Sequence, residues 1–230
     1  MKRIIYISLA ALMALAAVSC KKDNGNDNVQ KYGEGNLWAP MPKAVDLGLS
    51  VKWASANLFA SNEYQFGLYF AWGELQYKTE YLSDNYKYPA PANVPTTLPS
   101  SRDAAEEWLG EGWRMPTKSE IQELVDTFTD DDYTWKAETK KADNGNTVLY
   151  GWRVTSNAGK TKGNSIYLPA AGRYYTVLGY DGNSGLYWSS SIYDTWPYNA
   201  WALVFDETGP EVKFDTGRYF GLSIRPVYED

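Results

Sequence analysis

The chain contains no histidine and a single cysteine, Cys20. Without histidine it lacks the commonest general base and the commonest zinc ligand, and every catalytic triad that includes histidine is excluded. Because the cysteine lies in the N-terminal leader, the rest of the chain has no thiol for a disulfide, a thiolate metal site or a nucleophile. We therefore predict no metal, no cofactor and no catalytic residue. An enzyme built here would have to use carboxylates, tyrosine, lysine or a serine–lysine pair.

Positive charge is also scarce, since the formal net charge is −6. A nucleic-acid-binding protein needs a basic surface to displace counterions from phosphates. The composition therefore predicts no nucleic-acid partner.

Aromatic residues are abundant, at 16% of the chain with 19 tyrosines and 10 tryptophans. Their flat apolar rings with a polar group suit sugar stacking and protein interfaces. A β-rich core uses the same residues for cross-strand packing, and we expect most of them to serve there.

The N-terminus resembles an export signal. Lys2 and Arg3 precede an apolar run at 4–18, which is too short and wrongly flanked for a stable transmembrane helix. The run ends in Ala17-Val18-Ser19-Cys20, which resembles a bacterial lipobox, in which the cysteine is acylated, for example with palmitate, and becomes the new N-terminus. We predict a lipoprotein signal at 1–20 with lipidation at Cys20. Plain secretion with cleavage near Ser19 is the alternative.

The next segment, 21–36, is polar and almost devoid of apolar residues, which predicts a flexible tether. From residue 37 the composition becomes that of a globular protein, and we predict one domain at 37–230.

Two helices are predicted in the first half of this domain. Thr117 and Glu120 form a T-x-x-E capping box after Pro116, and apolar residues then recur at helical spacing to Phe128. A shorter helix is predicted at 102–109, where Gly110 ends it.

Strands are predicted around these helices, because short runs rich in apolar residues alternate with turn residues. They are expected at 45–58, 68–72, 133–140, 147–155, 165–170, 187–193, 200–206, 211–215 and 221–227, with a long loop at 77–101. The expected class is α+β.

Six segments carry a resemblance to a known family. They are 45–54 (VDLGLSVKWA), 69–74 (YFAWGE), 112–117 (GWRMPT), 167–172 (YLPAAG), 187–191 (YWSSS) and 220–227 (FGLSIRPV). Together they resemble the Fibrobacter succinogenes major paralogous domain group of bacterial lipoproteins, which looks like a branch of the C-type lectin-like fold and is related to retroelement-diversified target proteins. The resemblance implies two helices packed on small antiparallel sheets, beside a long irregular loop region that carries the binding surface.

Two activities of that fold do not follow. Calcium-dependent lectins use Glu-Pro-Asn or Gln-Pro-Asp followed by Trp-Asn-Asp, and none of these motifs occurs in the chain. Formylglycine-generating enzymes need active-site cysteines, which the domain lacks.

The C-terminal part holds the predicted ligand-binding residues. Strand alternation assigns Trp201, Leu203, Phe205, Val212 and Phe214 to the core. The neighbouring outward and loop residues mix aromatic, amide and charged groups, as binding surfaces do. They are Tyr193, Asp194, Trp196, Tyr198, Asn199, Lys213, Asp215, Arg218 and Tyr219. A merely solvated hairpin is the alternative.

Other candidates have simpler explanations. The acidic run 130–132 offers oxygen ligands for calcium, but it lacks EF-hand spacing and reads as a solvated turn. Glycoside hydrolysis would need two facing carboxylates, for which Glu74, Glu106, Glu107 and Glu111 are available. Arg114 and Arg225 are expected to be structural anchors that donate to loop carbonyls.

The combined prediction is an outer-membrane, surface-exposed lipoprotein that binds an external glycan or protein and is not an enzyme. A fimbrial or envelope structural subunit is the first alternative, and a carboxylate-based glycosidase is the second.

Overall fold

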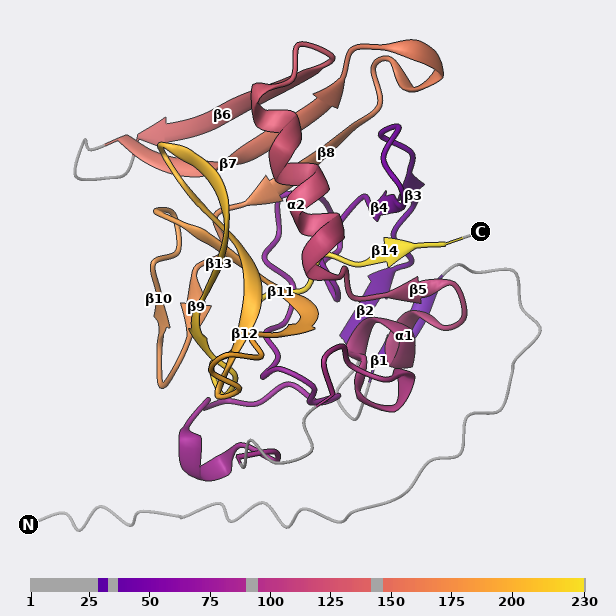
Figure 1. Cartoon of the computed structure of the whole chain (residues 1–230). Helices are drawn as coiled ribbons and strands as arrows, with labels where there is room; N and C mark the ends of the chain where they lie inside the picture. Colours follow the sequence, from indigo (N-terminus) through magenta and orange to yellow (C-terminus); the bar gives the residue numbers. More distant parts are fainter. Residues whose placement is uncertain (1–28, 33–36, 90–94, 142–146, 230) are drawn as a thin grey trace, which may run out of the picture.

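The chain folds into a mixed α+β domain of small, mostly antiparallel sheets with two α-helices among the residues described (Figure 1). The structure is a computed structural model that describes residues 29–32, 37–89, 95–141 and 147–229. The predicted signal at 1–20 and the lipidation residue Cys20 lie outside this range.

Two three-stranded antiparallel sheets form the larger part of the domain. One contains β6 (Tyr133–Lys141), β7 (Thr147–Ser156) and β8 (Ser165–Pro169), and the other contains β11 (Gly185–Ile192), β12 (Asn199–Asp206) and β13 (Gly209–Gly217). In both sheets the strands follow one another in chain order.

Three smaller sheets complete the β structure of the described residues. A four-stranded sheet has the order β3 (Ala44–Val45), β4 (Lys52–Ala54), β14 (Val227–Tyr228) and β5 (Trp113–Arg114), so that β14 near the C-terminus lies between strands from the first half of the chain (Figure 1). The pairs β1 (Val29–Tyr32) with β2 (Leu37–Pro40), and β9 (Arg173–Tyr174) with β10 (Leu178–Gly179), form two-stranded ladders. Strand β1 falls within the segment predicted as a tether.

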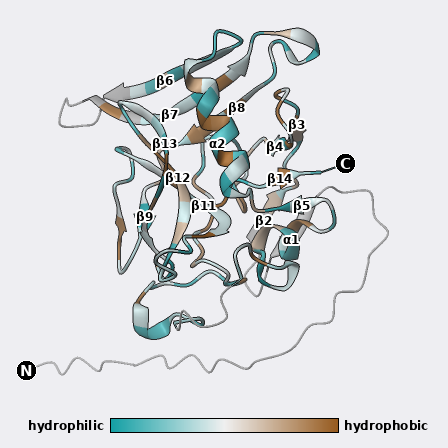
Figure 2. Ribbon diagram, in the orientation of Figure 1, coloured by the Kyte–Doolittle hydropathy of each residue, from teal (hydrophilic) through white to brown (hydrophobic). Residues whose placement is uncertain are grey.

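Both predicted helices are present, and only the first begins later than predicted, at Ala104 instead of 102. Helix α2 (Lys118–Asp126) has the expected capping box, in which Thr117 Oγ1 accepts from the Glu120 N–H and Glu120 accepts from the Thr117 N–H. Helix α1 (Ala104–Leu109) is capped by Asp103 and stops at Gly110, whose φ of 86° suits glycine. Hydrophilic and hydrophobic residues alternate along α2 (Figure 2), and its buried residues are Ile121 and Leu124.

The β11–β12–β13 sheet is covered on both faces. Leu203 and Phe205 pack in one apolar cluster with Ile121 and Leu124 of α2, together with residues of β7 and β8. Trp188, Ala200 and Ala202 belong to a second cluster on the other face, which also holds Phe70, Trp72 and residues of α1. The predicted alternation of β12 is therefore confirmed for Leu203 and Phe205.

The segment around Phe70 and Trp72 was predicted to be a strand, and this is wrong in detail. Both side chains are fully buried, but the backbone forms no regular ladder: it bridges Phe70 to Leu222, and Trp72 N donates to the Arg218 carbonyl. Side-chain bonds add to these, since Trp72 Nε1 donates to the Ser189 carbonyl and Trp188 Nε1 donates to the Phe70 carbonyl. This irregular chain is thereby fixed to β11.

Short 3-10 turns occur at Ser83–Asn85 (η1), Ser100–Arg102 (η2), Thr127–Thr129 (η3) and Gly159–Thr161 (η4). The predicted long loop at 77–101 is otherwise irregular where it is described, and α1 follows it. Arg225 acts as the predicted anchor, because its buried guanidinium donates to Asn57 Oδ1 and to the carbonyls of Ala54 and Tyr167.

Candidate functional site

The loop that joins β11 to β12 is short and held by its own backbone. Trp196 N donates to the Tyr193 carbonyl, Asn199 N donates to the Trp196 carbonyl, and Tyr193 N donates to the Asn199 carbonyl. This closed loop cannot collapse onto the sheet, so Trp196 and Tyr198 project from it and are 60% and 50% exposed. Their rings lie 6.1 Å apart.

Three further rings adjoin this loop and stack on one another. Tyr193 lies parallel to Phe214 with ring centroids 4.0 Å apart, and Trp201 packs edge-on against both at 5.2 Å. The Nζ atom of Lys118 lies 3.8 Å from the centre of the Trp201 ring. We call the five residues Tyr193, Trp196, Tyr198, Trp201 and Phe214 the aromatic face.

The structure corrects the prediction that Trp201 and Phe214 belong to the core. Trp201 is half-buried and Phe214 is 43% exposed. Helix α2 explains the difference: its buried residues cover Leu203 and Phe205, but the helix begins at Lys118, which lies over Trp201. The rings of Trp201 and Phe214 therefore lie on the sheet face that α2 covers, but beyond the N-terminal end of that helix.

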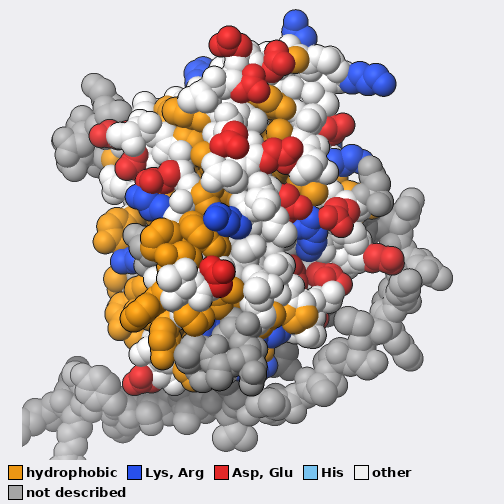
Figure 3. All heavy atoms as spheres, viewed as in Figure 1, with side chains coloured by type: hydrophobic (Ala, Val, Ile, Leu, Met, Phe, Trp, Pro, Cys, Tyr) orange, Lys and Arg blue, Asp and Glu red, His pale blue; other side chains and the backbone are white. Residues whose placement is uncertain are grey.

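A second group of rings comes from the β9–β10 hairpin and the end of β13. Tyr175 packs edge-on against Tyr219 and Phe220, and the guanidinium of Arg173 lies 4.3 Å from the Phe220 ring centre. Val177 and Tyr180 of the hairpin are also exposed. Figure 3 shows hydrophobic side chains gathered on the side of the molecule that carries β9, β10, β12 and β13, whereas acidic side chains gather over α2 and β6.

The remaining predicted site residues are placed as follows. Asp194 is exposed in the loop, Asn199 is half-buried at the start of β12, and Tyr219 is half-buried beside Tyr175. Lys213 forms an ion pair with Glu211 at 2.5 Å. The side chain of Asp215 lies outside what the structure describes.

Arg218 does not belong to the exposed surface, contrary to the prediction. Its side chain is only 1% exposed, and it lies between the rings of Trp72 and Tyr86. Its backbone N–H donates to the carbonyl of Tyr198, so it packs directly beneath the loop of the aromatic face. The sequence places Arg218 next to exposed residues, but the chain turns inward there.

A polar groove of about 550 Å³ runs along α2 and reaches the aromatic face through Lys118. Its lining combines carboxylates, an amide and hydroxyl groups. The lining residues are Leu49, Lys118, Ser119, Gln122, Glu123, Asp126, Thr127, Asp130 and Tyr133.

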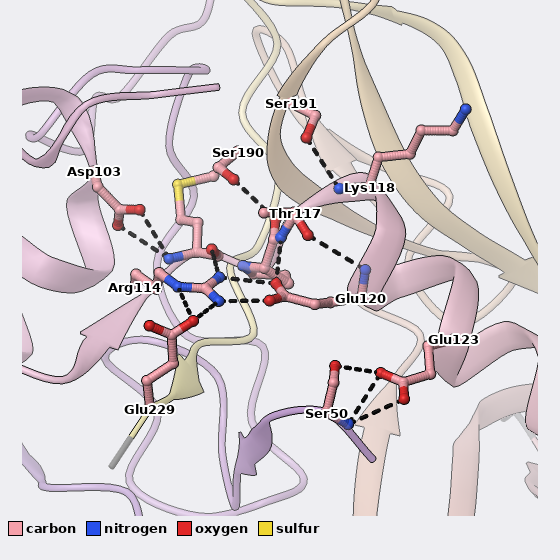
Figure 4. A network of polar contacts seen from close by, with 12 residues as sticks. Ser50, Asp103, Arg114, Thr117, Lys118, Glu120, Glu123, Ser190, Ser191 and Glu229 are labelled. Atoms are coloured by element: carbon pink, nitrogen blue, oxygen red, sulfur yellow. Dashed lines mark hydrogen bonds and ion pairs between the residues drawn. The ribbon is translucent and has the colours of Figure 1, made fainter. Parts of the chain in front are cut away.

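A network of ion pairs and hydrogen bonds fixes the start of α2, and with it Lys118 (Figure 4). Arg114 bonds to Glu120 and to Glu229 at the C-terminal end, while the Lys118 N–H donates to Ser191 Oγ. Burial opposes the ionisation of Glu120, but the bonds from Arg114 and Thr117 prevail and keep its pKa below the usual value. Figure 4 also shows Glu123 accepting from Ser50, which ties α2 to the β3–β4 loop.

Two of the acidic candidates take part in local hydrogen bonds and ion pairs. Among the described residues no three histidine, cysteine or acidic side chains are grouped so as to hold a metal ion. Asp130 Oδ1 accepts from the Asp132 N–H, as in an Asx turn. Glu74 is buried and pairs with Lys78 at 2.8 Å. No described helix is long and apolar enough to cross a membrane.

Sequence reasoning missed Lys118 and the β9–β10 hairpin as parts of this surface. Lys118 was predicted only as part of the helix that follows Thr117, and its neighbour Trp201 is 83 positions further along the chain. The adjacent tyrosines at 174 and 175 between turn residues were an available signal for the hairpin. No family model, curated protein or solved structure matches the chain.

Proposed function

We propose that this domain binds an external carbohydrate through its aromatic face. One observation carries the proposal: five aromatic side chains from one loop and two strands gather at the surface, and three of them are 43–60% exposed. Monomeric proteins rarely leave such a contiguous apolar group uncovered without a binding role.

The surroundings of the rings favour a sugar over a purely apolar partner. Lys118 borders Trp201 on one side, Asp194 lies in the same loop as Trp196, and the polar groove along α2 continues from Lys118. A sugar ring has an apolar face that stacks on aromatic rings and hydroxyl groups that bond to carboxylates and amides. Both kinds of partner are present within one surface.

The proposal includes a C-type lectin-like fold and a lipid anchor. Two helices, small antiparallel sheets and a long irregular segment between β4 and α1 support the first. The apolar run that ends at Cys20 supports the second, with the outer membrane as location. The expected binding mode is free of calcium, because the calcium-dependent sugar motifs are missing from the chain.

A glycan-array screen with purified protein tests the proposal and identifies the ligand. Trp196→Ala should then weaken binding by about 2 kcal/mol, a factor of about 30, with little change in stability, because the side chain is exposed. Tyr64→Ala is the matched control: Tyr64 is exposed to 41%, and it packs against Tyr150 and Tyr167 instead of the aromatic face.

Three results would contradict the proposal. They are the absence of any glycan ligand, unchanged affinity in Trp196→Ala, and an equal loss in Tyr64→Ala. Capture of a protein partner that Trp196→Ala abolishes, with no glycan bound, would assign the face to a protein ligand or to subunit assembly.

A further inference from the structure

A second group of rings surrounds the tip of the β9–β10 hairpin. Tyr175 in the turn is 44% exposed, and its ring lies 6.3 Å from that of Tyr219 and 5.6 Å from that of Phe220. Val177, at the end of the same turn, is 70% exposed. We call these four residues the hairpin platform. The hairpin lies on the side of the molecule where hydrophobic side chains gather (Figure 3).

Backbone hydrogen bonds fix the hairpin in place. Tyr174 and Gly221 exchange both of their backbone bonds, at 2.8 and 2.9 Å. The Tyr81 N–H donates to the Tyr175 carbonyl at 2.8 Å. Tyr175 is therefore presented by a fixed scaffold, and a surface that is already ordered binds a ligand at a lower entropic cost.

The hairpin platform adjoins the aromatic face. Strands β12 and β13 pair as far as Asn199 and Gly217, and beyond this pair the Arg218 N–H donates to the Tyr198 carbonyl at 3.0 Å. Tyr219 is the next residue, so standard backbone dimensions place the Cα atoms of Tyr198 and Tyr219 no more than about 11 Å apart. Because Tyr198 belongs to the aromatic face and Tyr219 to the hairpin platform, one extended ligand can contact both.

The hairpin platform offers the two kinds of contact that a sugar uses. Its rings present apolar surface, and the guanidinium of Arg173 lies 4.3 Å from the Phe220 ring centre. Stacking on a ring uses the flat face of a guanidinium and leaves the N–H groups at its edge for hydrogen bonds. Those N–H groups are donors suited to the hydroxyl groups of a carbohydrate.

We propose that the carbohydrate bound by the aromatic face is a linear, neutral polysaccharide chain that extends onto the hairpin platform. This inference rests on the proposed function and names its class of ligand. A single sugar ring is similar in size to one tyrosine ring, so it can stack on one of the two groups but not on both. The exposed rings form an open surface across which a chain can pass. The net charge of −6 disfavours an acidic polysaccharide.

Calorimetric titration of the whole protein with four series of oligosaccharides tests the proposal. The series are cello-, malto-, xylo- and laminari-oligosaccharides, each from the disaccharide to the hexasaccharide. In a series that binds, the affinity should rise at least about tenfold with length, because a chain that reaches the hairpin platform makes a second, linked contact. Hydroxyl-radical footprinting of the wild type, which needs no variant to fold, should show Tyr175 protected by the hexasaccharide and not by the disaccharide.

Variants of Tyr175 separate the two groups of rings. Tyr175→Ala should lose most of the gain with chain length and keep the wild-type affinity for the disaccharide. Tyr175→Phe should keep the gain, because it retains the ring. Trp196→Ala should weaken binding at every length. Tyr64→Ala is the matched control, since Tyr64 is exposed to 41% and packs against Tyr167, and it should behave like the wild type.

Equal affinity for the disaccharide and the hexasaccharide would overturn the inference and leave carbohydrate binding intact. A full gain with length in Tyr175→Ala, or an equal loss in Tyr64→Ala, would overturn it too. If none of the four series binds at any length, the ligand is not a linear neutral chain, whereas carbohydrate binding itself is decided by the glycan array. Protection of Tyr175 by the hexasaccharide alone, with a gain that Tyr175→Ala removes, supports the inference.

Discussion

Replacing Asp103 by alanine should destabilise the protein far more than removal of an ordinary helix cap. The Asp103 carboxylate is 3% exposed and accepts from the N–H groups of Ala105 and Glu106 at the start of α1. It also accepts from the N–H of Met115, 12 positions further along the chain, with both oxygens. One side chain thus caps a helix and joins it to the segment that leads into α2.

The expected magnitude follows from those bonds. Loss of the cap costs about 0.5–2 kcal/mol. The Met115 N–H would then be buried without a partner, which costs about 1–3 kcal/mol more. Asp103→Ala should therefore lower the free energy of unfolding by about 1.5–5 kcal/mol. Thr117→Ala, which removes a cap from the less buried start of α2, should lower it by about 1 kcal/mol.

Urea unfolding followed by far-ultraviolet circular dichroism measures both variants, and the midpoints are comparable if the denaturant slope is unchanged. If the two variants lose the same stability, the bond to Met115 contributes nothing and the reasoning from buried N–H groups fails here.

Three further predictions concern the core, the acid limb and the anchor. Leu203→Ala should lower the free energy of unfolding by about 2–5 kcal/mol, because Leu203 is fully buried. Trp201→Ala should lower it by less than half as much, because α2 does not cover Trp201. Equal losses in denaturant unfolding would mean that Trp201 belongs to the core. The pKa of Glu120 is held below its ordinary value of 4.5, so its ion pair stabilises the fold above that pH, and this stabilisation is lost as the pH falls. The free energy of unfolding should therefore fall less steeply with acidification in Glu120→Gln than in the wild type. Cys20→Ala should move the protein from the detergent phase to the aqueous phase in a partition assay, and a variant that stays with the membrane would contradict lipidation.

Local signals in the sequence were sufficient for the helices and most strands. The capping box of Thr117 and Glu120 specifies the start of α2 by bonds within one turn, and the structure confirms it. The class, α+β with small antiparallel sheets, is confirmed as well. The 68–72 segment was misassigned because a buried apolar run looks the same in sequence whether its backbone forms a regular ladder or only scattered bonds.

The candidate site was predictable only in part. The loop aromatics Trp196 and Tyr198 are exposed as expected, because turn residues keep them off the sheet. The exposure of Trp201 depends on where α2 begins relative to β12, which the sequence of either element alone does not specify. The burial of Arg218 between Trp72 and Tyr86 depends on positions far apart in the chain, so no local pattern could indicate it.

The most direct test of the aromatic face is hydroxyl-radical footprinting of the protein with and without its glycan ligand. Binding should protect Trp196, Tyr198 and Phe214 from oxidation and leave Tyr64, which is exposed to about the same extent as Phe214, unchanged. Protection of Tyr64, with the three aromatic-face residues oxidised as fast as in the free protein, would contradict the account.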